Sequence, residues 1–161
     1  MGEIATLLTV VGTFIGIVVG ILAVVRHFKP ESKPRILNPP NLAENGGRYV
    51  MVSGLVPQSR HRAHYWVAIQ PSNCRGAGLW WPQNEALQVD PDGSWILSHV
   101  RLGREGAAAG DDIGATFTIG LFEVSAKAHE HFRTFGSKDE ATGTLSGCRL
   151  LDSVEVRRVR F

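Results

Sequence analysis

An uncharged run near the N-terminus constrains this chain more than any other feature. The 22 residues 4–25 contain no Asp, Glu, Lys or Arg, and their polar members are Thr6, Thr9 and Thr13. As an α-helix such a run spans about 33 Å, and the hydrocarbon core of a bilayer is about 30 Å thick. A cleaved signal peptide is the competing interpretation, but the start "MGE" has no basic residue and "AVVRHFKP" is a poor cleavage site. The run therefore predicts a retained, single-pass transmembrane helix.

The charges around this run predict its orientation. All 17 Lys and Arg residues follow it, and only Glu3 precedes it. The positive-inside rule then places the N-terminal tail, residues 1–3, outside and the C-terminal domain in the cytoplasm, at the inner (plasma) membrane. Basic residues in the linker 26–35 would contact membrane lipid headgroups. The formal charge of +2 does not indicate a nucleic-acid partner. An outward-facing envelope domain requires the inverted topology.

Three glycines lie on one side of the predicted membrane helix. Gly12, Gly16 and Gly20 are four residues apart, and residues at this spacing stack on one helix face. Such a GxxxGxxxG face allows two helix backbones to approach closely in lipid. We therefore expect a homo-oligomer that forms through the transmembrane helix.

Residues 36–161 have the pattern of a β-domain. The stretch "HYWVAIQP", His64 to Pro71, alternates Tyr65, Val67 and Ile69 with Trp66 and Ala68. Such alternation is typical of strands. Further strands are expected at Arg48–Val56, Gly78–Gln83, on both sides of the turn "DPDG", at Ala115–Val124 and at the C-terminal end. A β-bulge near Arg157 and Arg158 would turn Val159 and Phe161 inward with Val154 and Val156.

One segment of this domain has helical spacing instead. In residues 124–136, Ser125 is suited to cap the start of a helix and Gly136 to end it. Ala128, Phe132 and Phe135 form an apolar stripe. The predicted fold class is therefore mainly β: a β-sandwich, favoured over a barrel, with one short helix, behind one N-terminal transmembrane α-helix.

The order of several motifs resembles a known family. The stretches "VSGLVP", "YWVAIQP", "LWWPQ", "VDPDGSW", "FTIGLFEV" and "LLDSVEV" follow one another as in a bacterial immunoglobulin-like module at the C-terminal end of membrane and signalling proteins. The resemblance runs from about Ile36 to Val156, and Trp81 stands where that family usually has Tyr. It implies an immunoglobulin-like β-sandwich and a binding or sensing role without catalysis.

Two groups of residues are candidate ligand contacts. Trp80 and Trp81 are adjacent, so on a strand they face opposite ways and one of them can meet a ligand. The alternative is that both only pack the fold. Arg60, Arg62 and His64 form a small basic patch, which would bind an anion unless it is a solvated loop.

Other chemistry finds little support in the sequence. His129 and His131 are two apart on the expected helix and cannot chelate one ion, so no metal site is predicted. Asp111 and Asp112, in a glycine-rich stretch, are typical of a solvated turn, and no nucleophile or phosphate-loop motif occurs. Cys74 and Cys148 are expected as free thiols in a cytoplasmic domain, or as one disulfide in the inverted topology.

Two functions remain open. The first is a membrane-anchored, non-enzymatic binding module with no cofactor and with a protein or small-molecule partner. The alternative is a transmembrane effector of a bacterial defence or stress pathway, whose β-domain senses a small signal such as a nucleotide.

Overall fold

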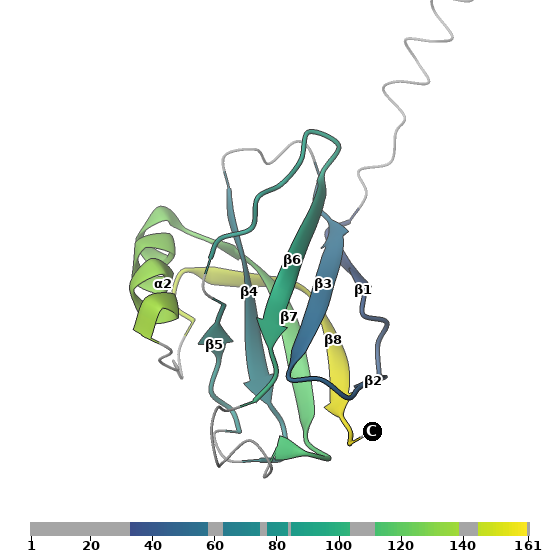
Figure 1. The fold of residues 1–161 in the computed structure, drawn as a ribbon. Coiled ribbons are helices and arrows are strands. Elements are labelled where there is room, and N and C mark those ends of the chain that lie inside the picture. Colours follow the sequence, from purple (N-terminus) through teal and green to yellow (C-terminus); the bar gives the residue numbers. More distant parts are fainter. Residues whose placement is uncertain are drawn as a thin grey trace, which may run out of the picture. The chain divides into compact units, whose positions relative to one another are not determined.

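The computed structural model describes residues 33–57, 63–74, 77–83, 85–103, 112–138 and 145–160, without the side chains of residues 135–138. In this part of the chain, eight strands form two sheets and one helix lies against the larger sheet (Figure 1). The elements are β1 (Arg35–Asn38), β2 (Ala43–Asn45), β3 (Tyr49–Leu55), β4 (His64–Pro71), β5 (Trp81–Pro82), β6 (Ser94–Arg101), β7 (Thr116–Val124), α2 (Ala126–Lys138) and β8 (Cys148–Arg158).

The two sheets differ in size and in strand order. The smaller has the order β1-β3-β6, and the larger has the order β2-β8-β7-β4-β5. All neighbouring strands are antiparallel except β2 and β8, which are parallel. The long strands β4 and β7 pair in regular register from His64 opposite Val124 to Pro71 opposite Phe117. This ladder forms the centre of the larger sheet.

The main core lies between the two sheets. From β4 it takes Tyr65, Val67 and Ile69, which the alternation placed on one face. Trp95 from β6 and Phe117 from β7 are the largest side chains that meet them, and both are about 1% exposed. Because apolar burial contributes roughly 25 cal/mol per Å², aromatic residues of this size supply much of the core's stabilisation.

A second, smaller core lies on the other face of the larger sheet, under α2. Trp66 and Ala68 from β4 meet Phe122 and Val124 from β7 there, and the helix adds Ala128 and Phe132. The ring of Phe132 meets the ring of Trp66 edge to face, with centroids 5.4 Å apart. Figure 1 shows α2 beside β4 and β5, away from the smaller sheet. The helix is therefore the cover for a sheet face that carries large apolar side chains.

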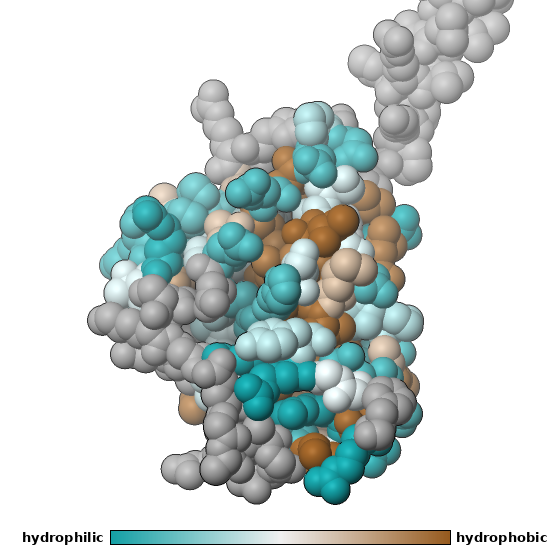
Figure 2. Space-filling view, viewed as in Figure 1, coloured by the Kyte–Doolittle hydropathy of each residue, from teal (hydrophilic) through white to brown (hydrophobic). Residues whose placement is uncertain are grey.

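The outer face of the smaller sheet carries exposed apolar side chains. Figure 2 shows hydrophobic surface over β3 and β6. Ile96 of β6 and Met51 of β3 are 64% and 51% exposed. Each alternates along its strand with core residues, so both point away from the larger sheet.

The predicted fold class is wrong as a whole and needs correction. The structure confirms a mainly β fold with one short helix. Among the residues it describes, however, no helix has the length and apolar character needed to cross a membrane. The only helix in this part of the chain, α2, has 13 residues. The predicted span 4–25, with Gly12, Gly16 and Gly20, lies outside the described residues.

Several local predictions are also corrected. Residues 86–90, before the "DPDG" turn, form no strand, so only β6 follows as expected. The helix does not end at Gly136 but continues to Lys138. The bulge of β8 lies opposite Leu121 and Phe122 rather than near Arg157, and Arg158 points inward in the same phase as Val154 and Val156. Register within a strand is set by its partners, which the sequence of β8 alone does not contain.

Packing of Trp95 against Gly54 gives a testable prediction. These residues are paired across β3 and β6, and a Cβ atom on Gly54 would lie 2.6 Å from Cζ2 of Trp95 and would overlap the backbone oxygen of Arg35. Gly54→Ala should therefore lower the free energy of unfolding by about 2 kcal/mol or more, as overpacking does. Urea unfolding of the full chain, followed by tryptophan fluorescence, measures this change.

Gly78→Ala is the matched control. Gly78 has a φ of +84°, and nothing lies within 4 Å of the position of its missing Cβ. Only backbone strain is added there, which costs about 1 kcal/mol. An equal loss in both variants would contradict the packing argument.

Candidate functional site

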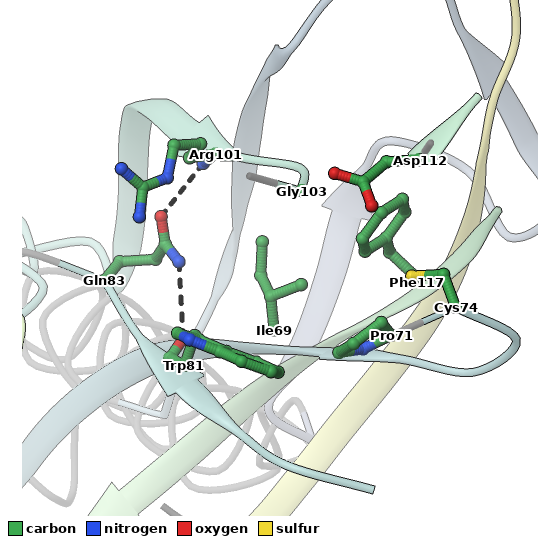
Figure 3. Close-up of a pocket in the computed structure, with 9 residues that line it drawn as sticks. All are labelled: Ile69, Pro71, Cys74, Trp81, Gln83, Arg101, Gly103, Asp112 and Phe117. Carbon is green, nitrogen blue, oxygen red and sulfur yellow. Dashed lines mark hydrogen bonds between the residues drawn. The ribbon is translucent and has the colours of Figure 1, made fainter. Parts of the chain in front are cut away.

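The best candidate site is a small pocket at the edge of the core, where β6 ends and β7 begins. Its volume is about 50 Å³. Its walls come from β4, β5, β6 and β7 and from the segments that follow β4, β5 and β6 (Figure 3). The residues that line it are Ile69, Pro71, Cys74, Trp81, Gln83, Arg101, Gly103, Asp112 and Phe117.

Apolar side chains form most of the pocket wall. Ile69 and Phe117 are core residues whose surfaces continue into the pocket, and Pro71 ends β4 beside them. Trp81, half-buried on β5, pairs with Ile69 across the ladder. A tryptophan ring next to a recess offers a large, rigid contact surface with one hydrogen-bond donor.

Gln83 ties the pocket's two sides together. Its Oε1 accepts a hydrogen bond of 2.9 Å from the backbone N–H of Arg101, and its Nε2 donates to the backbone oxygen of Trp81 at 3.3 Å. Both bonds are drawn in Figure 3. Because Gln83 is 9% exposed and connects the segment after β5 with β6, it fixes the distance between Trp81 and Arg101.

A buried ion pair, of which Asp112 lines the pocket, lies beside it. Asp112 is 1% exposed, and its Oδ2 lies 3.8 Å from Nη1 of Arg158, a residue that is 8% exposed. The same Nη1 donates to the backbone oxygen of Leu102 at 3.5 Å, and Nε of Arg158 has no hydrogen-bond partner among the described residues. Gly103 allows this approach, because a Cβ there would overlap Asp112 and lie 3.0 Å from Arg158 Nη1.

The solvated turn predicted for Asp112 is therefore wrong. Its carboxylate is buried because a cation from the last strand lies beside it, far along the sequence. One signal could have indicated this: Arg158 lies two residues after Val156 and four after Val154, in the phase of the core. Gln83 gave no comparable signal, since its role depends on β6.

The structure separates the other predicted ligand residues. Trp81 lines the pocket, whereas Trp80 packs edge to face on Phe122 under the helix side, with centroids 4.9 Å apart. His64 lies at the start of β4, where its ring stacks on His129 of α2 at 4.0 Å. Arg60 and Arg62 lie outside the described residues. The predicted site residues thus do not form one cluster in the part of the chain that can be examined.

Two cysteines and the arrangement of possible metal ligands are further features of the described residues. Cys74, at the pocket, and Cys148 are both partly buried, and burial raises the pKa of the Cys148 thiol. Within the described ranges, no group of three or more His, Cys, Asp or Glu side chains is placed to hold a metal ion.

Comparisons with known proteins add no family to this description. No protein-family model, no curated protein and no solved structure matches the chain. The resemblance to bacterial immunoglobulin-like modules therefore stays a prediction from the residues.

The buried pair gives a second testable prediction. Asp112→Ala would leave the Arg158 guanidinium buried without its counter-charge, so the free energy of unfolding should fall by about 3 kcal/mol or more. Arg133→Ala is the control, because Arg133 and Glu130 form an exposed pair 3.3 Å apart, and such pairs contribute roughly 1 kcal/mol or less.

A double variant separates charge from packing. Asp112→Leu with Arg158→Met removes both charges, and it should recover most of the stability lost in Asp112→Ala. Chemical unfolding of the three variants measures these differences. A loss in Asp112→Ala no larger than that in Arg133→Ala would contradict the role given to the pair.

Proposed function

We propose that the β-domain is a non-enzymatic binding module, and that the pocket beside Trp81 receives one apolar side chain of a partner polypeptide. The observation that supports this most strongly is the composition of the pocket wall. Ile69, Trp81 and Phe117 offer apolar contact, and Gln83 and Arg101 stand at its polar edge. Apolar recesses with a few convergent polar groups are typical of binding sites.

The size of the pocket favours a single side chain as its occupant over a whole small molecule. A volume of about 50 Å³ corresponds to about two water molecules, each of which takes roughly 30 Å³ in the liquid. Pockets that enclose drug-sized ligands measure roughly 300–1,000 Å³. The partner would therefore place one group inside and lie across the rim with the rest of its surface.

The residues at the rim fit a polypeptide partner. Tryptophan and arginine are enriched among the residues that contribute most to protein–protein binding, and such residues surround pockets that receive an anchor. Trp81 and Arg101 both line the pocket, and the two hydrogen bonds of Gln83 hold their backbones in place. A rigid recess loses little conformational entropy on binding, which favours affinity.

The alternative function, a membrane effector that senses a nucleotide, gains no support from this pocket, whose volume is far below that of a nucleotide site. Membrane localisation and self-association through Gly12, Gly16 and Gly20 stay predictions, because those residues lie outside the described part of the chain.

Capped amino acids test the proposal directly. Ligand-observed NMR with the full chain should detect N-acetyl-leucine amide or N-acetyl-phenylalanine amide with a Kd of about 5–100 mM, the affinity expected for burying one such side chain. Trp81→Ala should weaken this binding at least about tenfold, because it removes one wall of the pocket.

Leu79→Ala is the matched control. Leu79 precedes Trp81 by two residues, is 38% exposed and does not line the pocket, so its loss should leave binding unchanged. Binding of AMP that exceeds that of both capped amino acids, or binding of these probes that survives Trp81→Ala, would contradict the proposal.

A further inference from the structure

A hydrogen bond between two side chains joins α2 to the larger sheet. The indole Nε1 of Trp66, on β4, donates to Nδ1 of His129, on α2, at 3.1 Å. Trp66 is fully buried, with 0% of its surface exposed. A ring nitrogen can accept only where it has no proton, so His129 is neutral and its proton lies on Nε2. The bond exists in one protonation state only.

The groups around His129 favour that neutral state. His64, at the start of β4, stacks on the His129 ring with an interplanar angle of 15°. Burial lowers the pKa of His129 below its ordinary value of 6.5, and the nearby His64 lowers it further. On α2 itself, Glu130 raises this pKa and Arg133 lowers it. Two stacked imidazoles tolerate one positive charge better than two.

The remaining charges near this junction compensate each other or lie on other faces. Glu123 of β7 and Arg149 of β8 form an ion pair at the rim of the adjoining groove, which His64 and Cys148 also line. His131 lies exposed on α2, two residues from His129, and so on another side of the helix. The described part of β5, Trp81–Pro82, contributes no titratable group.

Protonation of His129 would turn an acceptor into a donor. The new Nδ1–H would face the N–H of Trp66, and the buried indole would lose its partner. A buried donor without an acceptor is costly to a folded structure. The cost falls on the junction between α2 and the sheet, because both ends of the bond lie there.

We propose that His129 is a pH-sensitive latch that holds α2 on the larger sheet at neutral pH and releases it in mild acid. Release would expose the apolar face that α2 covers, namely Trp66, Ala68, Phe122 and Val124. The main core between the sheets shares none of these side chains. The device is therefore local, and it converts a covered apolar face into a surface that a partner can reach.

The direction of the pH dependence follows from the pKa of His129. Because this pKa is lowered on folding, the unfolded or released state binds more protons, and docking stability rises with pH. The stabilisation is complete above the ordinary pKa of 6.5 and is lost as the pH falls from there through the lowered pKa of the docked state. In that window the opening equilibrium grows by up to about tenfold for each pH unit.

Hydrogen exchange of the full chain tests the latch. Protection factors, which correct for the intrinsic pH dependence of exchange, should fall for the amides of α2 between about pH 7.5 and about pH 5, by up to about tenfold for each pH unit between 6.5 and the lowered pKa of His129. Those of β3 and β6 should not change. At the higher pH, ¹⁵N NMR should show His129 neutral, with its proton on Nε2.

Three variants assign the effect to this bond. His129→Gln keeps an acceptor that does not titrate, so α2 should lose its pH dependence. Trp66→Phe removes the donor and should weaken that dependence, while the part due to burial of His129 and to His64 remains. His131→Gln, on the same helix, should behave as the unchanged chain.

The outcomes separate the proposal from general acid unfolding. Equal loss of protection in α2, β3 and β6, unchanged protection of α2, or a pH response that survives His129→Gln overturns it. If His129→Gln fails to fold, a charged His129 at about pH 7.5, or a pH response that is undiminished in Trp66→Phe, overturns it instead.

Discussion

Burial of both faces of β4 is the constraint on which the rest of this structure depends. Five consecutive residues of this strand, 65–69, are buried. Because successive side chains of a strand point to opposite faces, the larger sheet needs a cover on each side. The smaller sheet supplies one, over Tyr65, Val67 and Ile69, and α2 supplies the other, over Trp66 and Ala68. A chain that lacked either cover would expose large apolar side chains at the centre of its main sheet. The helix therefore shields one face of the larger sheet from water.

Local patterns in the sequence predict this central part of the fold correctly. The bounds of β4, its alternation and the start of α2 all depend on residues close together in the chain. Ser125 illustrates the point, since its Oγ accepts from the N–H of Ala128 at 3.3 Å, as expected of a helix cap. Features that depend on distant partners were predicted poorly. The sequence does not indicate the strands β1 and β2, because each is short and gains its hydrogen bonds from β3 or β8. The bulge of β8 was misplaced because its position is set by pairing with β7.

The candidate pocket shows the same division. Alternation predicts that Trp80 and Trp81 face opposite ways, and they do. It does not indicate which of them meets the recess, because that depends on which face of the sheet the helix covers. Since α2 lies on the side of Trp80, Trp81 is the residue left at the end of the main core. Asp112 was expected in solvent for a related reason. Its burial requires Arg158 and the absent side chain of Gly103, and neither is adjacent to it in sequence.

The pocket and the latch occupy opposite faces of one sheet, and β4 is the element they share. Ile69 contributes to the pocket wall, whereas Trp66 holds the helix through His129. Interiors of proteins are close-packed, so a shift on one face of a strand is transmitted to the other only if the strand itself moves. The ladder between β4 and β7 is regular along its whole length and resists such movement. Release of α2 would therefore expose the covered face, while the part of the recess formed by Ile69 of β4 and Phe117 of β7 stays held by this ladder. Under the proposed function, binding of a partner and exposure of a second surface thus depend on different faces of β4, because the side chains of a single strand alternate.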